Sequence, residues 1–139
     1  MLRMRYMPCD FHPLLLVLGN ASQLRHFSSV LEGFAATGEM ADLGQNGVFS
    51  EDTKVILREL DAAGREREGL WFASGGAPPV LEWRLTRERA EAFAEDVMKT
   101  ANGEVRAGSS TLECEVLNEI RVKVSFGEFE DRFLLGEAW

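Results

Sequence analysis

The sequence predicts an α+β fold in which two helices pack on one or two antiparallel-rich sheets. The main observation is that a strand followed by a helix occurs twice, at residues 13–39 and 79–104. Each copy begins with proline and ends with glycine and glutamate, and their lengths are nearly equal. Two or three strand-like segments follow each copy. The predicted order is therefore a tandem β-α-β-β(-β) repeat.

With 139 residues, the chain fits one domain that can fold without a metal or a disulfide. We expect residues 1–12 to form a loosely held leader. Residues 13–139 are predicted to form a single domain made of two pseudo-repeats, 13–76 and 79–139. The Gly/Pro-rich stretch at 75–79 interrupts regular structure and joins the halves.

The first repeat is expected to open with a strand at residues 14–18, because this short apolar run is typical of a strand covered on both faces. Asn20 and Gln23 have the spacing of a capping box, which predicts a helix start. Gly38 predicts the helix end, because glycine readily adopts the left-handed conformation that closes a helix. Gly33 offers an earlier end, since glycine weakens a helix interior.

Two further strands are predicted in the first repeat, at residues 53–60 and 69–74. Adjacent apolar side chains, such as Trp71 and Phe72, point to opposite faces of a strand. The sheet of this repeat therefore needs cover on both faces, and helices supply only one. The other cover comes from the second repeat or from a partner, a second copy of the chain included.

The second repeat carries the clearest local signals. A strand ending at Leu85 leads into a helix from Arg87 to about Asn102, which Thr86 caps and Gly103 stops. The apolar stripe of this helix is narrow and built largely of small residues. We therefore expect the helix to lie close against a sheet.

The C-terminal part of the second repeat is predicted to contain a hairpin centred on residues 117–119, followed by a last strand at 129–135. Apolar and charged residues alternate along both arms of the hairpin. One register places an apolar pair inside and two ion pairs outside. The predicted pairs are Val116–Ile120, Glu115–Arg121 and Glu113–Lys123.

Composition argues against several classes of partner. The 23 acidic and 15 basic residues give a formal charge of −8, which opposes binding to nucleic acid. No stretch approaches the roughly 20 apolar residues that a membrane span needs. Cys9 and Cys114 lack the CxxC spacing of metal or redox sites. We expect a cytoplasmic protein with free thiols, Cys114 being buried and inert.

Motifs of enzymes and cofactor sites are missing from the sequence. There is no GxGxxG, GxSxG or HExxH pattern. His12 and His26 are the only histidines, and the sequence has no second close pair of cysteine or histidine that would complete a zinc site with Cys9 and His12. We therefore expect no catalytic residues, no cofactor and no metal, while a site built from both histidines and carboxylates is the open alternative.

Acidic residues gather near the C-terminus. Residues 104–139 contain eight acidic and four basic residues. Solvated strand faces and a turn would explain this cluster without any function. The functional interpretation is an acidic surface for a basic protein partner, with Phe129 and Trp139 as apolar anchors. Its acidic members would be Glu113, Glu115, Glu128, Glu130 and Asp131.

Two functions are consistent with these observations. The first is a small acidic non-enzymatic protein-interaction module, of the immunity-protein or regulatory-subunit type. The second rests on a resemblance: tandem β-α-β-β-β modules of this length, with His12 before the first strand and a helix segment at 27–34, are similar to the vicinal-oxygen-chelate group of glyoxalase and bleomycin-resistance proteins. That resemblance implies a small-molecule or metal-binding domain. The chain departs from the family pattern by lacking a DPxGN-like turn before the last strand and a second histidine ligand.

Overall fold

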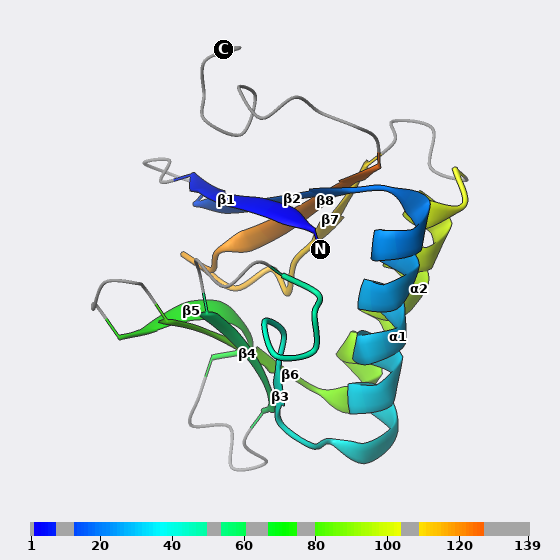
Figure 1. Cartoon of the computed structure of the whole chain (residues 1–139). Coiled ribbons are helices and arrows are strands. Elements are labelled where there is room, and N and C mark those ends of the chain that lie inside the picture. Colours follow the sequence, from blue (N-terminus) through cyan, green and yellow to red (C-terminus); the bar gives the residue numbers. More distant parts are fainter. Residues whose placement is uncertain are drawn as a thin grey trace.

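The computed structural model of the chain describes residues 2–7, 13–49, 54–60, 67–74, 80–103 and 109–126. It contains two helices and two four-stranded mixed sheets (Figure 1), so the predicted α+β fold with a repeated unit is confirmed. The elements in chain order are β1 (Arg3–Met7), β2 (Leu14–Gly19), α1 (Ala21–Thr37), β3 (Ala41–Asp42), β4 (Lys54–Glu59), β5 (Gly69–Ser74), β6 (Val80–Leu85), α2 (Arg87–Ala101), β7 (Ser109–Leu112) and β8 (Arg121–Phe126).

Each sheet takes two strands from each half of the chain. Sheet I has the order β1-β2-β8-β7, and sheet II has the order β3-β4-β6-β5. The central pairs, β2–β8 and β4–β6, are parallel, and the outer pairs are antiparallel. By strand pairing, the repeated unit is therefore β-β-α-β-β, with β1 corresponding to β5. Strand β1 lies within the segment that the sequence suggested as a leader, and it pairs with β2.

The two central parallel pairs have the same register. Residues 14–19 of β2 pair one to one with 121–126 of β8, and residues 80–85 of β6 pair one to one with 54–59 of β4. Each position of the two central strands of sheet I thus has a counterpart in sheet II. Two single bridges lie outside these strand pairs: Leu2 pairs with Phe49 in parallel, and Leu70 pairs with Ile120 in antiparallel orientation.

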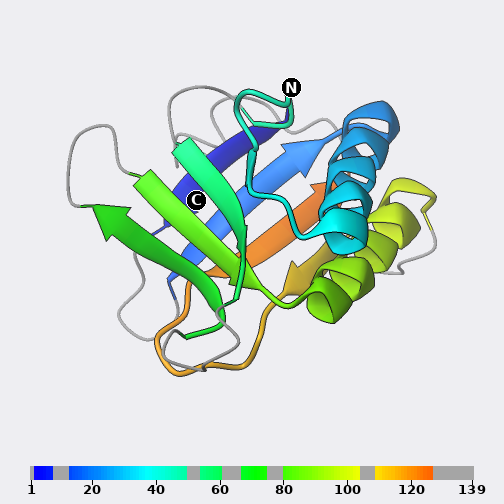
Figure 2. The same ribbon diagram turned by 90° about the horizontal axis from the view of Figure 1, so that it is seen from below.

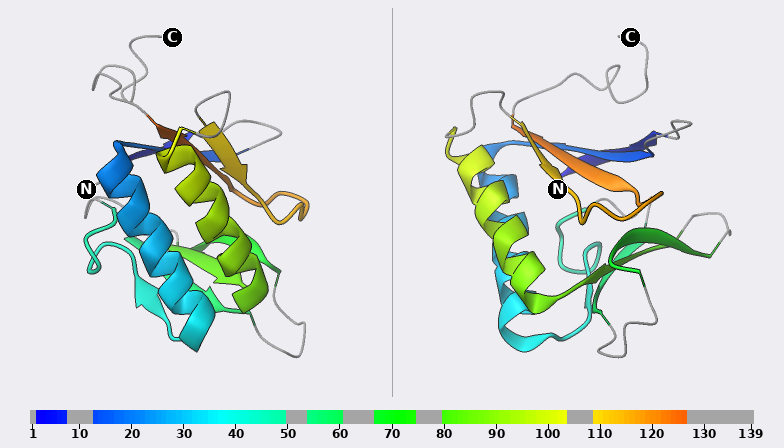
Figure 3. Two further views of the ribbon diagram at one scale, coloured as in Figure 1. Left: turned by 90° about the vertical axis from the view of Figure 1, so that its right-hand side faces the viewer. Right: turned by 180° about the vertical axis from the view of Figure 1, so that it is seen from behind.

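The two sheets face each other across the core, and the helix pair closes one side of the space between them (Figures 1 and 2). The helices lie side by side and antiparallel (Figure 3). The buried Ser28 Oγ on α1 donates a hydrogen bond of 2.7 Å to the Ala94 carbonyl on α2. Arg87 donates to the carbonyls of Ala35 and Ala36, so it brings a positive charge to the C-terminal turn of α1, which has no basic residue of its own.

Both helices begin and end where local chemistry predicts. Asn20 and Gln23 form the complete capping box, with hydrogen bonds of 2.9 and 3.0 Å. Gly38 closes α1 with a φ of 70°, and the helix runs through Gly33 without a break. At α2, the side chain of Thr86 accepts a hydrogen bond from the Arg89 amide.

The core is centred on Trp83 of β6, whose surface is only 2% exposed. Its ring centroid lies 6.1 Å from that of Phe27 on α1 and 5.8 Å from that of Phe93 on α2. Phe27 in turn contacts Phe49, at 5.4 Å between centroids. A continuous group of aromatic rings thus joins sheet II to both helices. No helix in the described part of the chain is long and apolar enough to cross a membrane.

Strands β7 and β8 form the predicted hairpin, but its predicted register is wrong by two residues. Leu112 pairs with Val122, and Glu113 forms the ion pair with Arg121 that was expected for Glu115. The paired strand ends earlier because residues beyond Glu113 adopt a loop held by the Glu119 side chain. The last strand expected at 129–135 lies outside the described residues.

Candidate functional site

The structure describes two of the seven residues predicted to bind a partner. Glu113 and Glu115 lie in the connection between β7 and β8, which we call the acidic loop (residues 113–120). The remaining five lie outside the described residues, and their role stays a prediction: Glu128, Phe129, Glu130, Asp131 and Trp139.

The backbone of the acidic loop adopts an unusual conformation. Glu115 has a φ of 59° and Asn118 a φ of 66°, both in the left-handed region. Asparagine tolerates this region well, whereas glutamate enters it at a cost. Surrounding contacts must therefore hold Glu115 in place.

Glu119 supplies those contacts. Its side chain is buried, and Oε1 accepts hydrogen bonds from the amides of Cys114 at 2.8 Å and Val116 at 3.3 Å. The other oxygen lies against Gly69 of β5, where φ is 114° and a side chain would collide with the carboxylate. Burial raises the pKa of the Glu119 carboxyl, while the donating amides act in the opposite direction. Glu119 thus fixes the loop and ties it to sheet II.

The outer surface of the acidic loop combines charge with one exposed apolar residue. Leu117 is 81% exposed at the turn of the loop. The loop and Arg121 line an open cavity of about 370 Å³. Glu113 Oε2 forms an ion pair with Arg121 Nε at 2.7 Å, which offsets part of the negative charge on this side. The loop therefore presents an apolar tip beside carboxylates.

Cys114 lies at the base of the acidic loop and is 8% exposed. Burial raises the pKa of its thiol well above the usual range, and the nearby carboxylates of Glu68 and Glu119 raise it further. A thiol that stays protonated is a poor nucleophile and a poor metal ligand. The buried position expected for Cys114 is confirmed, whereas Cys9 lies outside the described residues.

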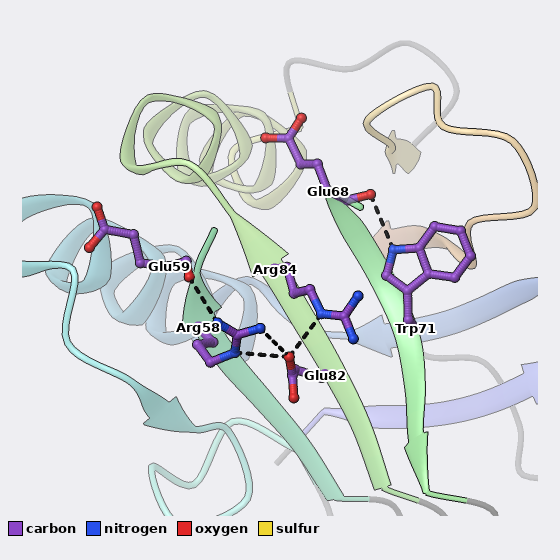
Figure 4. Close-up of polar contacts among 6 residues, drawn as sticks. All are labelled: Arg58, Glu59, Glu68, Trp71, Glu82 and Arg84. Atoms are coloured by element: carbon purple, nitrogen blue, oxygen red, sulfur yellow. Dashed lines mark hydrogen bonds and ion pairs between the residues drawn. The ribbon is translucent and has the colours of Figure 1, made fainter. Parts of the chain in front are cut away.

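A second polar cluster lies on the face of sheet II that points away from the core (Figure 4). Glu82 Oε1 accepts hydrogen bonds from Arg58 Nε at 2.8 Å, from a terminal nitrogen of Arg58 at 2.6 Å and from Arg84 Nε at 2.8 Å. The hydrogen bond from Arg84 lowers the pKa of the Glu82 carboxyl, and Arg58 lowers it further against the effect of burial. Charges in this cluster are directed at one another, which favours a stabilising role for the sheet face.

Trp71 borders the Glu82 cluster on β5. Its ring nitrogen donates to the Glu68 carbonyl at 3.2 Å, and the Arg67 guanidinium carbon lies 5.4 Å from the ring centroid. The Glu68 side chain also approaches Arg89 of α2, at 3.5 Å. These contacts connect β5 to the start of α2 and add no unpartnered group that points to a ligand.

The described residues offer few side chains that could together bind a metal ion. His26 Nε2 lies 2.6 Å from the Asn46 carbonyl, and His12 lies outside the described residues. No group of three or more histidine, cysteine or acidic residues that could hold a metal occurs among the described residues.

Comparisons with protein-family models, with curated proteins and with solved structures found no match. The acidic loop is therefore the candidate site on its geometry alone.

Proposed function

We propose that the protein is a non-enzymatic interaction module that binds a basic protein partner through the acidic loop. The observation that carries the proposal is the exposed Leu117 next to Glu113 and Glu115. Protein interfaces commonly have an apolar centre surrounded by a polar rim. The loop offers both elements within a few residues.

Preorganisation supports the same function. Affinity is lower when a loop must become ordered on binding, because that ordering costs entropy. The two amides that donate to Glu119, together with its contact at Gly69, hold the acidic loop in shape before a partner arrives. The net charge of −8 would also attract a basic partner from a distance. A preorganised loop and a negative net charge both suit a regulatory subunit or an immunity protein.

Neutralising the acidic loop tests the proposal. We expect the double variant Glu113→Gln/Glu115→Gln to retain the fold and to capture at least about tenfold less of a basic partner, because each lost carboxylate weakens charge complementarity. The measurement is quantitative affinity capture from the native host at low salt, followed by titration of the purified basic protein. Binding by the parent protein should weaken as salt rises, since salt screens exposed charges.

A matched control has the same change in net charge at another place. Glu88→Gln/Glu91→Gln removes two exposed carboxylates from α2 and should leave the affinity unchanged. Equal loss in both double variants would show that only overall charge matters. An unchanged affinity in the loop variant would contradict the proposed site.

The alternative of a small-molecule or metal-binding domain has a separate test. We expect no stoichiometric metal after the purified protein is dialysed against Zn²⁺, Ni²⁺ or Mn²⁺, because the described residues offer no suitable ligand group. Elemental analysis after removal of free metal is the measurement. One bound metal per chain would favour the alternative function.

A further inference from the structure

The outer face of sheet I, which points away from the core, differs in character from that of sheet II. Residues paired directly across strands point to the same face. Leu16 of β2 lies between Arg5 of β1 and Lys123 of β8, while Leu18 lies between Arg3 and Ser125. The face therefore has an apolar centre and a basic rim.

Burial shows that this apolar centre is covered. Leu16 is 5% exposed and Leu18 is 2% exposed, although neither belongs to the core cluster between the sheets and helices. None of the described helices or strands lies over this face of sheet I (Figures 1 and 3). The described helices and strands therefore do not account for the burial of the two leucines.

Comparison of corresponding positions in the two sheets strengthens the contrast between their outer faces. By register, Leu16 corresponds to Glu82 of sheet II, and Leu18 corresponds to Arg84. On sheet II these positions carry two members of the ion cluster, whose side chains are 21–22% exposed, which suits a face in contact with water. The leucines suit an apolar neighbour, so the two faces have different surroundings.

The remaining chain contains one segment that fits this face in length, place and charge. Residues 127–139 directly follow β8, which is a central strand of sheet I. Thirteen extended residues span up to roughly 40 Å, several times the spacing of about 4.8 Å between neighbouring strands. The segment has four acidic residues and one basic residue, and its large apolar side chains are Phe129, Phe133, Leu134, Leu135 and Trp139.

We propose that residues 127–139 dock on the outer face of sheet I of the same chain, with their apolar side chains over Leu16 and Leu18 and their carboxylates beside the basic rim. In this arrangement the basic rim of sheet I lies beside Glu128, Glu130 and Asp131 of the same chain. Docking leaves Glu113 and Glu115 of the acidic loop for an external partner. The inference does not depend on the proposed function, because it is argued from Leu16, Leu18 and their neighbours and not from the acidic loop.

Hydrogen–deuterium exchange of the full chain tests the docking. We expect backbone amides of residues 127–139 to be protected at least about tenfold relative to an unstructured chain. Protection should not change with protein concentration. In the variant Arg5→Glu/Lys123→Glu, which reverses the charges on both sides of Leu16, exchange of this segment should become about tenfold faster because its acids are repelled. Amides of α1 and α2 should keep their protection, which shows that the variant is folded.

The control Arg25→Glu/Lys54→Glu makes the same change in net charge away from this face and should leave the segment protected. The proposal is overturned by free exchange of residues 127–139 in the parent protein, which decides the matter even if the variant fails to fold. Equal loss of protection in the two folded variants also overturns it. Protection that appears only with dimerisation assigns the face to a second copy instead.

Discussion

Replacing Trp83 by alanine is expected to lower the free energy of unfolding by about 3–5 kcal/mol. Trp83 is almost fully buried, and its ring lies between Phe27 of α1 and Phe93 of α2. The variant loses both the burial of the ring and its aromatic contacts, and it leaves a cavity where sheet II meets the helix pair. Urea denaturation followed by circular dichroism measures the change.

The control for this substitution is Trp71→Ala, which removes the same side chain from the outer face of sheet II. Trp71 is only partly buried, so its loss should cost much less than the loss of Trp83. Similar losses of stability for the two variants would contradict the position of the core between the sheets and the helices.

Replacing Glu119 by alanine is expected to cost about 1–3 kcal/mol, because the amides of Cys114 and Val116 lose their acceptor. The acidic loop should lose its fixed shape, and partner binding should weaken with it. Glu119→Gln is the matched variant, since it keeps an oxygen that can accept from both amides. Urea denaturation and amide exchange of residues 113–120 measure the two effects. Equal behaviour of the alanine and glutamine variants would contradict this role of the carboxyl oxygen.

The raised pKa of the Glu119 carboxyl predicts how the stability of the protein depends on pH. Burial raises the pKa of Glu119 in the folded state above its ordinary value of 4.5. The folded protein therefore holds this proton more tightly than the unfolded chain does. The part of the stability that depends on this proton is fully present below pH 4.5 and is lost as the pH rises through the raised pKa of the folded state. Denaturation of the parent protein and Glu119→Gln across this range should give a difference that declines with rising pH; a rising difference would contradict the raised pKa.

Local features of the fold were predictable because they depend on neighbouring residues. Asn20 with Gln23, Thr86 and Gly38 identify helix ends through hydrogen bonds and backbone conformation within a few residues. The partner of each strand depends on distant parts of the chain. The apolar run of β2 and the alternation along β6 show that strands form, but not that they pair in parallel with β8 and β4.

The candidate site was predictable only in part, because its geometry depends on the hairpin register. The pattern of acids identified Glu113 and Glu115, but the hairpin register was wrong because a shift of two residues keeps the same side chains on the same face. The buried carboxylate of Glu119 selects the observed register, and sequence reasoning had assigned this residue to the turn. The exposed Leu117 was also missed, although an apolar residue in a polar turn is a usable signal.

Site-specific photo-crosslinking at position 117 tests the central claim most directly, because it reports whether a partner contacts the acidic loop. A photoreactive amino acid replaces Leu117 in one protein and Met40, another exposed apolar residue, in a control. We predict a crosslink to the purified basic partner from position 117, its loss in the Glu113→Gln/Glu115→Gln background and none from position 40. Equal crosslinks from both positions, or a crosslink from 117 that ignores the two glutamates, would contradict the acidic loop as the binding site.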